Sequence, residues 1–338
     1  MAKIIGGRTN IAIARETTRG VAETPVTGNM YWLPWINFDF DDKAEKYVSK
    51  EALGVIDESA EQYVTEKWGE GKVEGEIRDK SFGLLLYAAL GAWTPAVNGA
   101  AFNHTFTVAQ TNQHTSLSIW VDDPNSDYIF ELAMMDNLEL TIETGKLATF
   151  SAGFVSRPSQ TTSMTAGINS VPAKTTLATE NKFIASNASI KLANHRDNLD
   201  PTSEINVQSL KITITKNLLR KHVLGSAQPD DIINQTVAVE GTFTLPYQDK
   251  IYKDYDLDNT YKAIEIKMEN RAVDLGGGIY PTIVITLPRV GFMNWTPKRP
   301  KGELYEQTIG FRAFRDVSTG ENLIYNIVLT NAVGLTGY

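Results

Sequence analysis

The sequence predicts an all-β protein with one prominent helix, built from two related halves. Most hydrophobic segments alternate apolar and polar residues with a period of two, which is typical of strands that face a core on one side. One segment, residues 80–91, instead shows the period of an amphipathic helix. The tripeptide Val-Glu-Gly occurs at residues 73–75 and again at residues 239–241, which are separated by about half of the 338-residue chain. This spacing predicts a duplication, with surface loops of unequal length between the matching strands.

The composition excludes several classes of protein. The chain carries a net charge of −8 and is 42% hydrophobic, as expected of a folded globular protein with an acidic surface. It contains no cysteine, which excludes disulfides, thiolate metal sites and cysteine nucleophiles. No stretch is apolar for long enough to span a membrane, and no signal-peptide pattern is found, so we expect synthesis in a reducing cytoplasm. An acidic protein is also a poor candidate for gripping nucleic acid, because it repels phosphates.

The first half of the chain leads from an irregular segment through strands to the helix. Residues 1–30 show no clear period, and we expect an extended arm with weak strand character. The strand patterns "WLPWINFDFDD", "EQYVTEKW" and "KVEGEI" follow. We then expect the helix at residues 80–91, with Asp79 or Ser81 as its N-cap and Gly91 as its C-terminal stop. The apolar stripe that should pack this helix against a sheet consists of Phe82, Leu85, Leu86 and Leu90.

Strand patterns resume after the helix and are interrupted at residues 158–182, a segment rich in Ser, Thr, Ala and Pro. We interpret this segment as a linker between a first unit, residues 1–157, and a second unit, residues 183–338. The order of the strand motifs is repeated: "VEGEI", "SLSIWVDD", "NLELTIETG" and "FSAGFVSR" correspond to "VEGTF", "AIEIKMEN", "TIVITLPRVGF" and "QTIGFRAFR". Where the first unit has its helix, the second has "QDKIYKDYDLDN", which is too polar to be the same element.

No combination of residues predicts catalysis. None of the histidines has metal-ligand spacing or lies beside a nucleophile motif, so we expect them in solvated positions or turns. They are His104, His114, His195 and His222. We therefore predict that the chain is not an enzyme and that it binds no cofactor.

One acidic segment resembles a calcium-binding loop in spacing. Asp254, Asp256, Asp258 and Glu265 occupy four of the template positions, and Asn259 stands where the template has glycine. The flanking segments "GTFTLPY" and "AIEIKM" read as strands, whereas this type of loop joins two helices. A solvated loop between strands is therefore favoured, and no metal is expected.

Several segments, taken in this order, resemble the tail tube proteins of long-tailed bacteriophages: "ARETTRGVAETP", "WLPW", "EGKVEGEIRDKSFGLLLYAALG", "SLSIWVDD" and "NIVLTNA". The resemblance is most specific over residues 12–92. It implies β-sandwich or barrel-like units whose sheets join into a ring-wide inner β-barrel. Such rings stack into a tube around the tape-measure protein, and DNA later passes through the channel. The resemblance also implies a location in the tail of the virion, after synthesis in the host cytoplasm.

The implied partners are other copies of the chain, the tape-measure protein, the tail terminator and the tail-tip or baseplate proteins. Some members of the family carry two fused units and form a trimeric ring of pseudo-six-fold symmetry, which the duplication favours here. A ring of six chains is the alternative. Residues 1–30 and 40–60 are then available to bridge neighbouring rings.

The net negative charge of the chain suggests that carboxylates line such a channel. A wall that carries carboxylates does not neutralise phosphates, so it lets DNA pass without tight binding. Four glutamates lie on the polar faces of candidate barrel strands, and we expect them to face the channel. They are Glu66, Glu74, Glu76 and Glu240.

A carbohydrate- or receptor-binding β-sandwich, of a phage tail or a cell surface, is the alternative function. It predicts exposed aromatic side chains, for which Trp93, Trp120 and Trp295 are candidates. These residues lie in or beside apolar strand patterns, which favours packing in the core.

Overall fold

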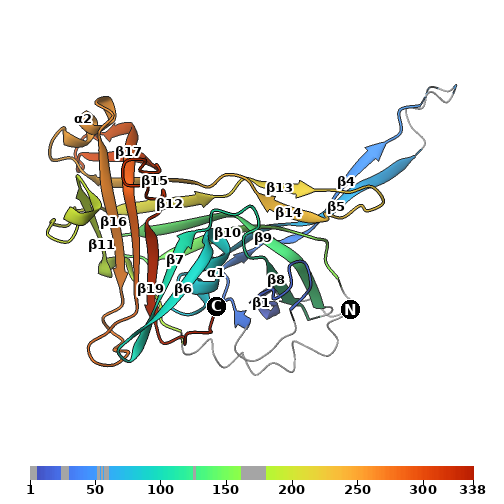
Figure 1. Ribbon diagram of the computed structural model, residues 1–338. Helices are drawn as coiled ribbons and strands as arrows, with labels where there is room; N and C mark the ends of the chain where they lie inside the picture. The colour runs from blue at the N-terminus through green and yellow to red at the C-terminus, as the bar shows by residue number, and fades with distance from the viewer. Residues whose placement is uncertain are drawn as a thin grey trace.

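The computed structural model describes residues 6–23, 30–51, 54, 56, 61–124, 127–160 and 180–338, and it is mainly β, as predicted (Figure 1). Two α-helices are present in these ranges, α1 Ser81–Leu90 and α2 Ile251–Leu257. Neither is long and apolar enough to cross a membrane. The strands of the first half are β1 Asn10–Arg15, β2 Met30–Trp32, β3 Asn37–Phe38, β4 Asp41–Val48, β5 Gln62–Glu76, β6 Gly91–Asn98, β7 Ala101–Val108, β8 Leu117–Asp122, β9 Asp127–Glu143 and β10 Thr149–Ser156. Those of the second half are β11 Ala188–Ala193, β12 Ser209–Thr215, β13 Leu218–Lys221, β14 Asp231–Asn234, β15 Ala238–Pro246, β16 Tyr261–Glu269, β17 Thr282–Lys298, β18 Glu306–Ala313 and β19 Asn326–Asn331.

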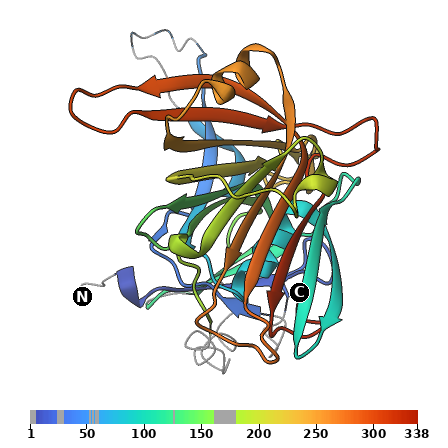
Figure 2. The ribbon, with the colours of Figure 1, turned by 90° about the vertical axis from the view of Figure 1, so that its left-hand side faces the viewer.

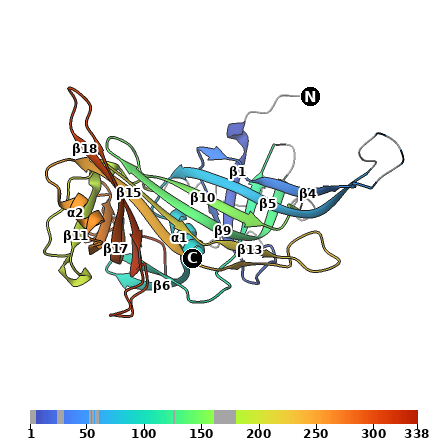
Figure 3. The same ribbon diagram turned by 90° about the horizontal axis from the view of Figure 1, so that it is seen from above.

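A central antiparallel sheet runs through both halves of the chain. Its strand order is β4–β5–β10–β9–β12–β15–β18–β17. β12 lies between β9 of the first half and β15 of the second, so the sheet continues across the middle of the chain without a break. Figure 3 shows how this sheet extends from the projecting β4 and β5 to β17 and β18.

Two strands of 17 residues each, β9 and β17, carry the chain from the central sheet into further layers. The beginning of β9 pairs with β8, which pairs with β1 and through it with β2. The beginning of β17 pairs with β16 and β19. β19 pairs in turn with β7, so the last strand of the second half lies against the first half (Figure 2). One continuous hydrophobic core therefore contains residues from both halves.

Part of the segment expected to be an extended arm is a buried strand instead. Residues 11–14, "IAIA", are at most 1% exposed and lie between β8 and β2. The expectation of an arm is wrong for these residues, because an apolar run that is paired on both sides belongs to the interior of a sheet. Residues 1–5 and 24–29 lie outside the described residues, as does most of the expected linker, at residues 161–179.

Helix α1 lies at the centre of the molecule, and it is buried on nearly all sides (Figure 1). Gly91 ends it in the left-handed conformation, at φ 83°, as predicted. The predicted N-cap is wrong, because Lys80 precedes the helix without a side-chain cap. The carboxylate of Asp79 instead accepts hydrogen bonds from the backbone and side-chain nitrogens of Asn181, at 2.8 and 2.7 Å. The buried residues of α1 include Phe82, Leu84, Leu85, Leu86 and Leu90, each at most 1% exposed.

The segment expected to be a loop after β15 contains α2. Lys250, which precedes the helix, forms an ion pair of 3.2 Å with Asp254, and Asp256 accepts a hydrogen bond of 3.0 Å from the backbone nitrogen of Trp295. Tyr252 and Tyr255 pack against the core, and the ring of Tyr255 stacks on that of Phe292. The loop prediction is wrong because these two tyrosines, three residues apart, give the segment one apolar side. Among the residues that the structure describes, no group of three or more His, Asp or Glu side chains could hold a metal.

Two of the histidines are buried, which contradicts the expectation of solvated positions. Nδ1 of His104 accepts a hydrogen bond from Trp93 Nε1 at 3.1 Å, and its Nε2 donates to the carbonyl of Val333 at 3.0 Å. Burial lowers the pKa of His104, and burial together with the nearby Lys216 lowers the pKa of His114 to about 4. Both rings are therefore neutral parts of the core at pH 7.

The tryptophans that an aromatic binding surface would need also belong to the core. Trp120 is 4% exposed, and Trp93 and Trp295 are partly buried against the main hydrophobic cluster.

Candidate functional site: the polar face of the central sheet

The central sheet has one apolar and one polar face, and the repeated Val-Glu-Gly motif shows how they arise. In β5, the side chain of Val73 is fully buried, whereas that of the next residue, Glu74, is on the other face and partly exposed. The same alternation holds in β15, where Val239 is buried and Glu240 is exposed. Successive side chains of a strand point to opposite faces, so the glutamates lie on the face away from the core.

The glycine of each motif provides room for an aromatic ring. Gly75 pairs with Phe150 on β10, and Gly241 pairs with Phe311 on β18. A Cβ atom at Gly75 would lie 3.0 Å from the Phe150 ring and 2.7 Å from the carbonyl of Pro34. At Gly241 it would lie 2.4 Å from the Phe311 ring. Both motifs therefore need glycine on the core side of the sheet, and the glutamate between valine and glycine is held on the polar side.

The pairing register places polar side chains of neighbouring strands in rows across this face. Each member of one row pairs with the next, from β5 to β18. The row consists of Glu74, Ser151, Glu139, Thr213, Glu240 and Arg312. The adjacent row on this face, two pairs further along the strands, consists of Glu76, Thr149, Thr141, Lys211 and Thr242, and it ends at Gly310, which has no side chain.

Most of the carboxylates on this face are paired with basic groups. Lys211 lies 2.8 Å from Glu139, and Arg312 lies 3.3 Å from Glu240. Glu74 accepts a hydrogen bond of 3.3 Å from the hydroxyl of Ser151. Because this hydroxyl is neutral, the contact does not compensate the negative charge of Glu74. The acidic residues on the face are Glu74, Glu76, Glu139, Glu143, Glu240 and Glu306, and the basic ones include Lys72, Lys211, Lys298 and Arg312. Arg78 and Lys182 also form ion pairs with Glu76, and Lys146 forms one with Glu143.

The structure brings together three of the four glutamates singled out in the sequence. Glu74 and Glu240 lie in the same row, and Glu76 lies in the adjacent one. Glu66 lies apart from them, in the part of β5 that projects beyond the sheet, with an oxygen 3.3 Å from Nε2 of His222. Sequence reasoning missed Glu139 and Glu143 of β9, although the alternation in "NLELTIE" places both on the same polar face.

A projecting arm continues the sheet beyond this face. It consists of β4 and the first part of β5, and the hairpin of β13 and β14 runs beside it (Figures 1 and 3). The guanidinium of Arg220 lies over the ring of Trp68, 3.8 Å from its centroid. The backbone nitrogen of Lys67 donates to the carbonyl of Ala227 at 2.7 Å. The arm of the first half is thus supported by a hairpin of the second.

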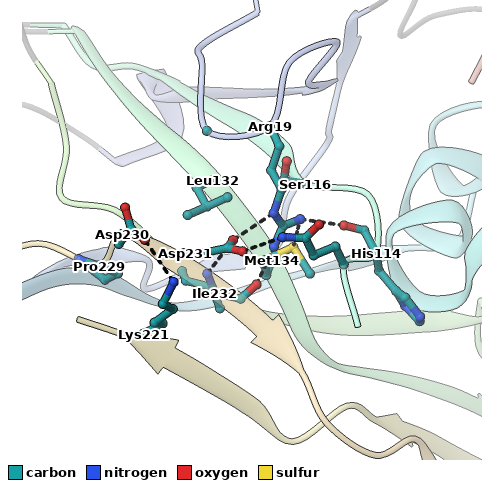
Figure 4. A network of polar contacts seen from close by, with 12 residues as sticks. Arg19, His114, Ser116, Leu132, Met134, Lys221, Pro229, Asp230, Asp231 and Ile232 are labelled. Carbon is teal, nitrogen blue, oxygen red and sulfur yellow. Dashed lines mark hydrogen bonds and ion pairs between the residues drawn. The ribbon is translucent and has the colours of Figure 1, made fainter. Parts of the chain in front are cut away.

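A polar network at the base of this hairpin joins it to the first half (Figure 4). Arg19 donates to Asp231 at 2.8 Å and to the carbonyls of His114, at 2.7 Å, and Ile232. Partial burial opposes the ionisation of Asp231, but hydrogen bonds from Gln113 and Arg19 lower its pKa. These contacts hold the hairpin in its position beside the arm. They are structural contacts, because each nitrogen of the Arg19 guanidinium donates to an acceptor within the protein.

Comparison with known proteins identifies the family. No curated protein matches the sequence. The family model of the phage tail tube protein matches residues 6–313, which is nearly the whole chain. The family is structural and forms part of the phage tail. The chain therefore belongs to the phage tail tube protein family.

Proposed function

We propose that this protein is the tube subunit of a phage tail, in which copies of the chain close into rings and the rings stack around a channel for DNA ejection. The observation that carries the proposal is the family match together with a central sheet that ends in two strand edges. The tape-measure protein, the tail terminator and the tail-tip or baseplate proteins are the partners that such a tube requires. Accumulation in the virion tail, after synthesis in the host cytoplasm, follows from the same role.

The strand edges support closure into a ring. All eight residues of β4 are exposed, and β4 forms one edge of the central sheet. At the other edge, residues 296–298 of β17 pair with β18 and, within the described ranges, with no other strand. Unpaired edges expose backbone donors and acceptors, and closing the sheet into a barrel removes them. β17 of one chain could pair with β4 of the next chain. Such a pair would join two chains as the pairing of β9 with β12 joins the two halves of one chain.

The order of the strands supports two fused tube units, residues 1–157 and 183–338. The first unit contains the order β5–β10–β9–β8 and the second contains β15–β18–β17–β16. A helix follows β5 and β15 alike. With the Val-Glu-Gly motifs aligned, the registers place Phe150 at the position of Phe311. A continuous sheet and a shared core join the units, so the pair acts as one building block of a ring.

We predict that each ring contains three chains. If each chain supplies two units, three chains complete a pseudo-six-fold ring. Averaged end-on views in negative-stain microscopy, combined with the mass per ring, measure the number of chains. Six chains per ring would contradict the fused-unit arrangement and would place the second unit outside a barrel built from the first.

We place the polar face of the central sheet toward the channel. The opposite face carries the core, so the polar face is the one available to line a closed barrel. Glu74 would repel phosphates, and Glu76 and Glu240 would keep Lys182 and Arg312 from neutralising phosphates, which removes the counterion release that drives non-specific DNA binding. Glu66 would face the channel further along the axis, beside the β13–β14 hairpin. This repulsion is screened beyond about 8–10 Å at ordinary ionic strength, so it acts on DNA close to the wall.

We predict that assembled tubes do not retard duplex DNA in a gel at physiological salt. The double variant Glu74→Lys and Glu240→Lys should retard DNA, because it converts one row of the wall to net positive charge. The double variant Asp197→Lys and Asp200→Lys makes the same change in net charge at exposed positions after β11, outside the central sheet, and is the matched control. Retardation of DNA by the unchanged tubes would show that the channel wall is not repulsive.

A further inference from the structure

Helix α1 belongs to the first half of the chain, but ionisable side chains from later in the chain contact it at both ends. At its first turn, the carboxylate of Glu180 accepts a hydrogen bond of 2.8 Å from the hydroxyl of Ser81. At its last turn, Nζ of Lys216 donates a hydrogen bond of 2.7 Å to the carbonyl of Ala88. An acid therefore lies at the positive end of the helix dipole, and a base lies at its negative end.

Lys216 is a buried base in surroundings that disfavour its positive charge. It follows β12 directly and is 1% exposed. Burial and the positive charge of Arg19 outweigh the attraction of Asp136, and they lower the pKa of Lys216 to about 7. Lys216 contributes in turn to the low pKa of His114. The charged and titratable groups around its amine are thus Asp136 of β9, Arg19 after β1 and His114 before β8.

Glu180 is a carboxyl group in surroundings that disfavour its negative charge. Burial raises its pKa to about 7, and the nearby carboxylate of Asp79 acts in the same direction. The hydrogen bond from Ser81 and a neighbouring arginine act in the opposite direction and are outweighed. Burial also raises the pKa of the two tyrosines beside this group above the ordinary value of 10, so both stay protonated. The charged and titratable groups around Glu180 are Arg78, Asp79, Tyr31 and Tyr338.

We propose that Glu180 and Lys216 form a pH-responsive clamp on α1, which makes the connection between the two halves of the chain weakest near neutral pH. At each end of the helix, the dipole favours the charged form of the side chain, whereas burial favours the neutral form. Because these two effects oppose each other, the charge on each group depends on pH in the neutral range. The clamp is a property of the single chain and does not depend on the proposed ring assembly.

The direction of the pH effect follows from the two pKa values. Glu180 keeps its proton up to about pH 7 in the folded chain, so stability is lost as the pH rises from the ordinary pKa of 4.5 to about 7. Lys216 loses its proton above about pH 7 in the folded chain, so stability is gained as the pH rises from 7 to the ordinary pKa of 10.5. Near pH 7 both contributions are at their smallest, and one of them grows on either side.

Proton uptake during unfolding tests the basic end of the clamp on the unchanged chain. At pH 8.5, unfolding should take up about one proton per chain, because Lys216 is neutral when folded and charged when unfolded. Few other side chains titrate at this pH. A pH indicator in weakly buffered urea measures the uptake. Lys216→Met should abolish it, and the matched control Lys250→Met, at a side chain that is 76% exposed, should retain it.

The pH dependence of stability tests the acidic end. Between pH 4.5 and 7.5, Glu180→Gln should gain about a hundredfold in the folding equilibrium constant relative to the unchanged chain, because the variant has no carboxyl group to keep protonated. Urea denaturation at several pH values gives these constants. Glu303→Gln, at an exposed position, is the matched control and should follow the unchanged chain at every pH.

Three results would overturn the clamp. Unfolding of the unchanged chain at pH 8.5 without proton uptake would show that Lys216 is charged in the folded protein. Uptake that persists in Lys216→Met would assign the proton to another group. A stability profile of Glu180→Gln that runs parallel to that of the unchanged chain would show that Glu180 titrates as an exposed carboxyl group. If Lys216→Met does not fold, the uptake by the unchanged chain still decides whether Lys216 is neutral.

Discussion

Replacement of Leu86 by aspartate is expected to prevent stable folding of the chain, so that neither rings nor tubes are recovered. Leu86 is fully buried in α1, and α1 packs against β6, β7 and β9. The substitution removes buried apolar atoms, which alone costs about 2–5 kcal/mol for leucine. It also places a carboxylate among buried apolar side chains, which costs several kcal/mol more or forces protonation. Together these costs approach the total stability of a typical domain, about 5–15 kcal/mol.

The conservative variant Leu86→Met separates polarity from shape at this position. It should cost less than about 1.5 kcal/mol, because the two side chains have similar volumes. Chemical denaturation of both variants measures the free energy of unfolding, and microscopy measures the yield of tubes. An undiminished yield of tubes from Leu86→Asp would show that this side chain is not buried in the assembled protein.

The position of α1 could be predicted from the sequence, but its amino-terminal contacts could not. The spacing of apolar residues and Gly91 are local signals, and they place the helix within one residue of its observed ends. The partners of Asp79 and Ser81 are Asn181 and Glu180, about a hundred residues away in the chain. Burial there raises the pKa of Glu180 to about 7, so this carboxyl group is partly protonated at neutral pH. No local pattern predicts such a pairing, because it depends on how the two halves meet.

The other features that were not predicted from the sequence also depend on which residues are buried by distant parts of the chain. The run "IAIA" of β1 is too short to show a period, and its place between β8 and β2 depends on pairing with strands far along the chain. The segment of α2 is mostly polar, and its two inward tyrosines become a signal only when the strands beneath them are known. His104 is buried because Trp93 and Val333 satisfy both of its ring nitrogens.

The polar face of the central sheet could be predicted one strand at a time but not as a surface. Alternation in "KVEGEI" and "AVEGTF" indicates that Glu74 and Glu240 share the side of the sheet away from the core. Whether they lie in one row depends on the pairing registers of β10, β9 and β12. These registers are set by turns and by pairing between strands far apart in the sequence. Glu66 follows the same alternation, yet it belongs to the arm, because β5 continues beyond its pairing with β10.

The other large effect is expected from Tyr338→Ala, which should destabilise the chain by about 3–5 kcal/mol, the range for removing a large aromatic side chain from a core. The Tyr338 side chain lies between α1 and the rings of Tyr31, Trp93 and His104. Its hydroxyl donates to the carbonyl of Lys80 at 2.7 Å and accepts from Asn331 at 2.8 Å. It therefore connects the segment after β19 to the start of α1, and its loss leaves a cavity at the junction of the two halves.

Two matched variants divide this effect into its parts. Tyr338→Phe keeps the ring but leaves the carbonyl of Lys80 and the amide of Asn331 without this partner, which should cost about 1–3 kcal/mol. Gly83→Ala keeps the tyrosine but places a methyl group within 2.1 Å of its ring, so the ring must move, at a cost of about 1–3 kcal/mol. Urea denaturation of the three variants gives the free energies of unfolding. If Tyr338→Ala is no less stable than Tyr338→Phe, the ring does not fill the space beside α1.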